Sequence, residues 1–252
     1  MGRDSETWTM THAVAFGADL AFIHDRGFGA FARGSAPGIL SLLAKNGITA
    51  GSIVDLGCGS GIWARELADS GYRVVGVDIS PDMIKMARRH VPEAELHVQS
   101  YLQFRLPACQ AVTALGEVFN YLFDEGNSLR SLRRLFAEVF NVLTPKGLFV
   151  FDVAQPRPWK GPKQGYREGE DWTCFVHYDY DSEKQQLTRH IVTFRKAGNA
   201  YRRREETHRQ QLYQGTTLAG VLRDVGFRVR LVRSYGAYRL PDHVVGIVAR
   251  KP

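Results

Sequence analysis

Two hydrophobic periodicities alternate along the first 153 residues of the chain. Short continuous apolar runs predict buried strands, and apolar residues three or four apart predict helices. Two helices are predicted within residues 12–46, the second with Pro37 in its first turn and Ser35 as its cap. Strands are predicted at Ser52–Leu56, Tyr72–Val77, Ala94–Val98, Ala111–Leu115 and Gly147–Val153, and further helices at Gly61–Ser70, Pro81–His90 and Asn127–Leu143. This order predicts βαβ units and a parallel sheet covered by helices.

The alternation of strands and helices stops at Gln155. Residues 155–170 are rich in Pro and Gly, which predicts a loop. After it the pattern predicts three strands without helices between them, at Trp172–Tyr180, Gln186–Arg195 and Tyr201–Leu212. A helix at Thr216–Asp224 and two strands at Phe227–Val232 and Val244–Ala249 are predicted to follow. We therefore expect three parts, namely residues 1–154, an antiparallel β insertion at 155–214, and residues 215–252.

The composition is that of a globular protein that needs no cross-links. The chain has 252 residues, 44% hydrophobic and 23% charged, and its 3 cysteines show no CxxC spacing. These features favour a reducing compartment and indicate no metal site. The first ten residues are polar and acidic, unlike a signal peptide, and no apolar run is long enough for a membrane helix. We expect a cytoplasmic protein that does not bind a membrane.

The net charge of +7 is unevenly distributed. The segment Arg195–Arg233 holds ten Lys and Arg residues against three acidic ones. A basic face of this kind can attract nucleic acid or an anionic substrate. A solvated, Arg-rich surface is the simpler explanation, and RNA stays an alternative partner.

The segment Val54–Gly61 reads VDLGCGSG and joins a predicted strand to a predicted helix. Glycines at this point let a ligand approach the backbone at the carboxyl end of the strand. The next strand ends at Asp78, whose carboxylate can accept hydrogen bonds from both ribose hydroxyls. A dinucleotide fingerprint would need glycine at position 62, where Ile62 stands, and Asp55 would repel a pyrophosphate. An ammonium-bearing ligand suits Asp55 better.

These segments resemble the class I S-adenosylmethionine-dependent methyltransferases. VDLGCGSG is similar to their first motif, VVGVDISPDMIKMA to their second, and Leu143–Val153 to a later one. The resemblance implies an α/β fold with a Rossmann-like, doubly wound, mostly parallel seven-stranded sheet, here with the antiparallel β insertion after the fifth strand. It implies S-adenosylmethionine as cofactor and S-adenosylhomocysteine as product, without a metal. The insertion is similar to those of small-molecule N-methyltransferases, including amino-sugar enzymes.

The resemblance also implies roles for particular residues. The methionine moiety of the cofactor is expected at Asp55, Gly57, Cys58, Gly59 and Gly61, the ribose at Asp78, and the adenine between Ile79 and Met83. Many members have an acidic residue after the third strand, where this chain reads VQSYL, so Gln99, Ser100 or the backbone is expected to replace it. Leu115 and Gly116 are expected beside the reacting methyl group.

Methyl transfer requires orientation above all, and a base only when the nucleophile carries a proton. The (D/N)PPY, Pro-Cys and paired-glutamate patterns of nucleic-acid and arginine methyltransferases are not found at the corresponding places. We therefore predict methylation at N or O of a small-molecule acceptor by a monomer or homodimer. Glu117, His208 and Tyr178 are the candidates for handling the proton. The alternatives are an RNA methyltransferase and a non-catalytic cofactor-binding protein.

Overall fold

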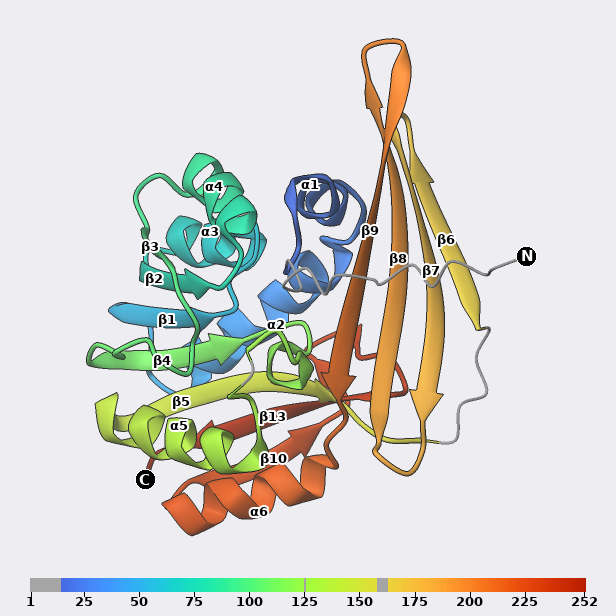
Figure 1. Ribbon diagram of the computed structural model, residues 1–252. Helices are drawn as coiled ribbons and strands as arrows, with labels where there is room; N and C mark the ends of the chain where they lie inside the picture. The colour runs from blue at the N-terminus through green and yellow to red at the C-terminus, as the bar shows by residue number, and fades with distance from the viewer. Residues whose placement is uncertain (1–14, 125, 158–162) are drawn as a thin grey trace.

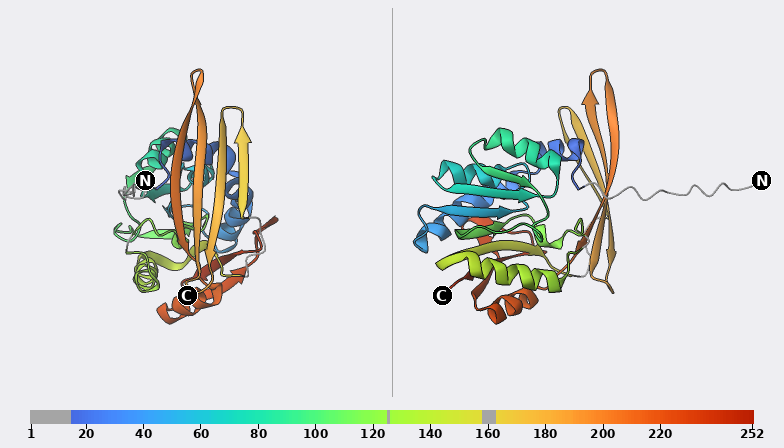
Figure 2. Two further views of the ribbon diagram at one scale, coloured as in Figure 1. Left: turned by 45° about the vertical axis from the view of Figure 1, so that its right-hand side comes forward. Right: turned by 60° about the vertical axis from the view of Figure 1, so that its left-hand side comes forward.

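A central sheet flanked by helices and a separate antiparallel sheet make up the molecule. The computed structural model describes residues 15–124, 126–157 and 163–252. The four strands of the second sheet stand beside the α/β body, and helix α1 lies between the two (Figure 1). The right-hand view of Figure 2 shows the second sheet nearly edge-on, against one side of the body.

The central sheet has seven strands in the order β10-β13-β5-β4-β1-β2-β3. Neighbours from β5 through β4, β1 and β2 to β3 are parallel, whereas β13 runs antiparallel to both β5 and β10. The strands are β1 (Ser52–Leu56), β2 (Arg73–Asp78), β3 (Glu95–Val98), β4 (Cys109–Ala114), β5 (Leu143–Ala154), β10 (Arg228–Val232) and β13 (Val244–Arg250). This mostly parallel sheet confirms the predicted fold class.

Helices cover both faces of the central sheet, as its continuous apolar strands require. One hydrophobic cluster joins the sheet to α5 and α6, and a second joins it to α2 and α3. The helices are α1 (Ala18–Gly27), α2 (Ala30–Lys45), α3 (Ile62–Asp69), α4 (Pro81–His90), the short 3₁₀ helix η1 (Val118–Asn120), α5 (Leu129–Val142) and α6 (Gly215–Val225). Ser80 caps α4 by accepting a hydrogen bond from the Met83 N–H at 3.1 Å, directly after β2.

The insertion forms a four-stranded antiparallel sheet in the order β6-β7-β8-β9. Its strands are β6 (Gln164–Gly169), β7 (Trp172–Asp181), β8 (Gln186–Ala197) and β9 (Ala200–Gln211). Alternation directs Trp172 and Cys174 of β7 toward α1, where they are buried with Leu20 and Ile23. The sheet is therefore attached to the body through the N-terminal helix.

The structure corrects four details of the sequence prediction. The second helix begins at Ala30, so Pro37 lies inside it and Ser35 is no cap. Packing explains this, because the buried face of α2 (Ala36, Ile39 and Leu43) outweighs the local effect of proline. Strand β5 starts at Leu143, ahead of the predicted Gly147. The part of the first predicted helix at residues 12–14 lies outside the described residues.

The other two corrections concern strands with little apolar character. Residues 164–169, predicted as loop, form the edge strand β6, which is largely exposed and is held by backbone pairing to β7. A short hairpin of β11 (Ser234–Tyr235) and β12 (Tyr238–Arg239) was not predicted either. The polar β6 carries no hydrophobic alternation, and β11 and β12 are only two residues each, too short to show one although Tyr235 is buried. Residues 158–162 of the predicted loop lie outside the described part of the chain.

Within the described residues, no helix is both long and apolar enough to cross a membrane.

Candidate functional site

The glycine segment after β1 forms a tight loop into α3. Gly57, Gly59 and Gly61 all have positive φ angles, of 64°, 55° and 85°. A side chain at Gly57 would also clash, because an added Cβ would lie 2.6 Å from Val118 Cγ1. Conformation and space together require glycine there, and the loop leaves backbone open at the end of β1.

Asp78 organises this loop from the end of β2. Its carboxylate accepts the Gly59 N–H at 2.9 Å and the Ser80 N–H at 2.8 Å. Burial raises the pKa of Asp78, against the effect of these two hydrogen bonds. Each carboxylate oxygen has a second lone pair, so Asp78 can still accept hydrogen bonds from a ligand.

Asp55 lies on β1, where only 2% of its surface is exposed. Its carboxylate accepts the Thr113 hydroxyl at 2.8 Å, and Thr113 in turn accepts the Trp63 indole N–H at 3.0 Å. Burial raises the pKa of Asp55 to about 7. A buried carboxylate without a cationic partner is costly, so this position suits a positively charged ligand.

One cavity joins the glycine loop, both carboxylates and the N-terminal helices. Ten residues predicted to bind the cofactor line it: Asp55, Gly57, Cys58, Gly59, Asp78, Ile79, Met83, Ser100, Leu115 and Gly116. Gly61 and Gln99 do not line it. Gly61 sits behind the loop with positive φ, and the Gln99 side chain is directed to the Gln103 carbonyl at 3.3 Å.

An acidic residue that the sequence reasoning missed lies at the Ser100 end of the cavity. Asp124 lines the cavity, and its carboxylate accepts the Ser100 hydroxyl and the Gly126 N–H. The family pattern predicts an acidic residue directly after the third strand. Asp124 instead follows β4 in the sequence, 24 positions after Ser100. Only the tertiary fold brings it to Ser100.

Glu117 lies next to the cavity wall but does not line it. Its carboxylate accepts hydrogen bonds of 2.9 Å from both Arg189 Nη2 and Gln210 Nε2, and His243 Nε2 lies 3.4 Å away. Burial would raise the pKa of Glu117, but Arg189, His243 and Gln210 lower it to about 2. Glu117 therefore connects the core to β8 and β9 as an ionised, fully paired group.

The backbone of Glu117 is fixed as firmly as its side chain. Its φ angle is 63°, and its N–H donates to the Asp152 carboxylate at 2.7 Å, next to the Gly116 N–H at 3.0 Å. Burial raises the pKa of Asp152 to about 7. Asp152 thus holds the turn that presents Leu115 and Gly116 to the cavity.

His208 and Tyr178, the other two candidates for proton handling, also lie outside the cavity lining. His208 is 1% exposed, bonds to Glu206 at 2.9 Å, and packs its ring against Phe16 and Phe123, each at 4.7 Å. Tyr178 lies on β7 of the insertion and packs beside Ala154, Leu187 and Leu212. Arg189 links the three candidates outside the cavity lining. It donates to Glu117 and is the strand partner of both Tyr178 on β7 and His208 on β9.

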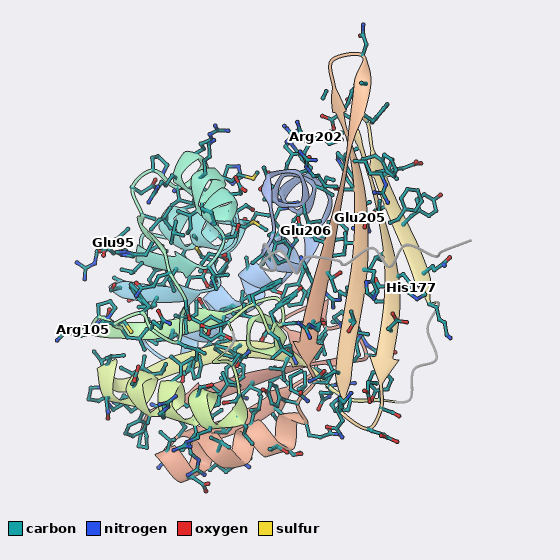
Figure 3. The ribbon with its side chains drawn as sticks, viewed as in Figure 1. Glu95, Arg105, His177, Arg202, Glu205 and Glu206 are labelled. Carbon is teal, nitrogen blue, oxygen red and sulfur yellow. The ribbon has the colours of Figure 1, made fainter. Side chains whose placement is uncertain are left out.

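The N-terminal segment forms a cavity wall that sequence reasoning did not predict. Phe16 lines the cavity, its carbonyl accepts the Ser80 hydroxyl at 2.9 Å, and the Gly17 N–H donates to Glu206 at 3.0 Å. Asp19 is ion-paired with Arg195 and Arg202 of the insertion. Figure 3 shows Arg202 and Glu206 on β9 close to α1. These bonds place α1 over the cavity, between α4 and β9.

The described residues contain no group of three His, Cys, Asp or Glu side chains that could hold a metal ion. No Lys or Arg is among the described residues that line the cavity. Its charged side chains are the carboxylates of Asp55, Asp78 and Asp124.

A family model described as "Methyltransferase domain" matches residues 28–232. The chain belongs to the methyltransferase domain family. This membership confirms the methyltransferase prediction made from the glycine loop and Asp78. The match extends through the insertion and through the strands of the central sheet except β13.

Relatives and solved structures of similar fold agree with this membership. The chain is 28% identical over 211 residues to the dTDP-3-amino-3,6-dideoxy-alpha-D-glucopyranose N,N-dimethyltransferase of Streptomyces fradiae, covering 79% of each chain. A sugar N-methyltransferase from Streptoalloteichus sp. has the same fold, with a TM-score of 0.79 at 17% identity and 99% coverage of both chains. An amino pentose methyltransferase from Micromonospora echinaspora, solved with S-adenosylmethionine bound, has a TM-score of 0.73 at 18% identity, covering 92% of this chain and 95% of its own.

Proposed function

We propose that this methyltransferase transfers the methyl group of S-adenosylmethionine to N or O of a small-molecule acceptor. The observation that carries the proposal is a pair of carboxylates, the buried Asp55 and the half-buried Asp78, toward the ends of adjacent strands around an open glycine loop. The cofactor carries a sulfonium and an ammonium group, and the cavity lining offers carboxylates and no described cation to oppose them. A pyrophosphate-bearing dinucleotide would face the same carboxylates unfavourably.

Each part of the cofactor has a partner in this arrangement. Asp78 would accept the ribose hydroxyls, and Asp55 with the loop of Gly57 and Gly59 would hold the methionine end. Asp124, through its bond to Ser100, would accept the adenine amino group and so replace the acid that is missing after the third strand. When bound, the cofactor supplies an electrophilic methyl group. Leu115 and Gly116 would flank it, on the turn that Asp152 fixes.

The insertion at residues 155–214 is proposed to cover the acceptor side of the cavity. Its strand β9 reaches the cavity wall through Glu206 and His208, which contact Gly17 and Phe16. Glu117, His208 and Tyr178 would then act by positioning the wall and the insertion. By covering the cavity, the insertion would exclude water from the reaction, so that the acceptor and not water receives the methyl group.

A transfer assay tests the proposal. The protein is incubated with methyl-labelled S-adenosylmethionine and small hydroxyl and amine acceptors, with unmodified RNA as a separate arm. The proposal expects label in at least one small acceptor and S-adenosylhomocysteine in equal amount. Label transferred to RNA alone would overturn the small-molecule assignment, and cofactor binding without any transfer would favour a non-catalytic role.

A further inference from the structure

Aromatic side chains form the part of the cavity that the cofactor motifs do not account for. We call this part the ring chamber, and it is lined by Phe16, His24, Phe28, Phe31, Tyr121 and Phe123. Five of the rings contact one another, and Phe31 packs against Tyr238. The Phe16 ring centroid lies 5.3 Å from that of His24 and 5.9 Å from that of Phe123, and Tyr121 stacks on Phe123 with centroids 5.0 Å apart. Such walls bind flat apolar groups by burying their surface and by stacking.

The ring chamber contains one imidazole, that of His24 on α1. Its Nδ1 is buried and has no hydrogen-bond partner among the described residues. Burial lowers the pKa of His24 to about 4. The nearby His208 and Arg189 also lower this pKa, whereas Asp25 raises it. The imidazole is therefore neutral at neutral pH, and one ring nitrogen has a lone pair that can accept a hydrogen bond.

The lining of the ring chamber does not suit an anionic acceptor. No Lys or Arg is found among the described residues that line it. The cation nearest to Tyr121 is Arg189, which donates to the Tyr121 hydroxyl at 3.0 Å and is already paired with Glu117. At the rim, Arg167 stacks over Phe28 at 5.0 Å while donating to the Gly27 carbonyl, and Arg33 lies beside Gly29. A phosphate enclosed among the rings would lose its hydration without a cation in the described lining to replace it, which is costly.

We propose that the ring chamber binds an uncharged, ring-bearing acceptor whose N–H or O–H donates a hydrogen bond to His24, and that it excludes nucleotide-linked sugars. The inference rests on the proposed function, because it assigns the acceptor half of the same cavity. In the reaction the acceptor lone pair forms a bond to the methyl carbon as the carbon–sulfur bond breaks, and the electron pair remains on sulfur. The acceptor proton passes to the His24 imidazole and from there to water, so that charge and atoms balance.

This assignment separates the chain from its relatives in a specific way. The Streptomyces fradiae relative is named for a dTDP-linked amino sugar, which carries two phosphates. The ring chamber offers aromatic walls, and no Lys or Arg is among its described lining residues. We therefore expect the acceptor of this chain to differ from a diphosphate-linked sugar although the fold is shared, since function depends on individual site residues.

Calorimetric titration of the protein saturated with S-adenosylhomocysteine tests the proposal. The probes are 2-naphthol, its methyl ether 2-methoxynaphthalene, and dTDP. The variants are His24→Ala and Phe123→Ala, and the control is His177→Ala on β7, an exposed imidazole bonded to Asp179 outside the cavity lining. A Kd for S-adenosylhomocysteine within about twofold of the unmodified protein shows that each variant is folded.

We expect 2-naphthol to bind and dTDP not to bind. His24→Ala should weaken 2-naphthol at least about fivefold but leave 2-methoxynaphthalene unchanged, because the ether has no proton to donate. Phe123→Ala should weaken both ring probes, and His177→Ala neither. Binding of dTDP, failure of 2-naphthol to bind, or an equal loss of both ring probes in His24→Ala would overturn the inference alone. Failure to bind S-adenosylhomocysteine would overturn the proposed function and the inference with it.

Discussion

Arg189 on β8 donates a hydrogen bond of 2.9 Å to the Glu117 carboxylate, and this ion pair joins the insertion to the end of β4. The side chains are 21% and 14% exposed. Replacing Arg189 by Ala would leave Glu117 buried without its charge partner. We expect the free energy of unfolding to fall by about 3 kcal/mol or more, measured by urea denaturation.

Two comparisons show whether this loss comes from the buried charge. The ion pair between Arg133 and Asp224 is 2.7 Å long but about half exposed, so Arg133→Ala should cost less than about 1 kcal/mol. Combining Arg189→Met with Glu117→Gln removes both charges and should recover part of the stability. Equal effects of Arg189→Ala and Arg133→Ala would contradict the anchoring role of Glu117.

Cofactor affinity should depend on pH through Asp55. The pKa of Asp55 in the free protein is raised to about 7, so below pH 7 the carboxyl is mostly protonated. Binding the cofactor ammonium requires the ionised form. Affinity for S-adenosylmethionine should therefore rise between about pH 5.5 and 7, by up to about tenfold per pH unit, with release of a proton. The affinity should level off toward pH 8, because Asp55 is then ionised. The α-amino group of the cofactor, with an ordinary pKa of about 8, also begins to lose its proton there.

Calorimetry in buffers of different ionisation enthalpy measures this proton directly. The raised pKa of Asp78 adds to the release in the same direction. Asp55→Asn should bind more weakly at pH 7.5 and show a reduced pH slope. An affinity that does not change from pH 5.5 to 7.5 would show that Asp55 does not face a cationic group of the cofactor.

Asp78→Ala should weaken S-adenosylmethionine at least about tenfold. The substitution removes the carboxylate expected to accept the ribose hydroxyls and also releases the Gly59 N–H that it now binds. Glu95→Gln, an exposed change on β3, is the matched control and should leave the Kd unchanged. Equal affinities for the two variants would mean that the ribose is held elsewhere.

Asp124→Ala tests the assignment of the adenine amino group. S-adenosylhomocysteine carries that amino group, and S-inosylhomocysteine carries an oxygen in its place. The unmodified protein should prefer S-adenosylhomocysteine at least about tenfold, because the oxygen would face the Asp124 carboxylate. In Asp124→Ala the preference should nearly disappear. A preference that survives the substitution would assign the amino group to the backbone or to Ser100 alone.

The sequence was sufficient to predict the parts of the site that depend on local chain geometry. The loop of Gly57 and Gly59 and the strand-end position of Asp78 follow from a strand, a turn with positive φ angles and a helix that are contiguous in the sequence. The parallel sheet followed from the alternation of apolar strands and amphipathic helices. All of these features have short-range signals.

The remaining part of the site depends on contacts between distant segments. Asp124 meets Ser100 across 24 positions, and Phe16 meets His208 across most of the chain. Glu117 has partners on β8 and β9, Arg189 and Gln210, that no local pattern indicates. A single sequence gives no indication of which distant side chains will meet, so the aromatic wall and His24 became visible only in the structure.

The most direct measurement of the central claim is a calorimetric titration of the protein with S-adenosylmethionine and, separately, with NAD. We predict one site for S-adenosylmethionine, competition by S-adenosylhomocysteine at the same site, and no heat of binding with NAD. Tight binding of NAD together with no binding of S-adenosylmethionine would contradict the assignment of the cavity.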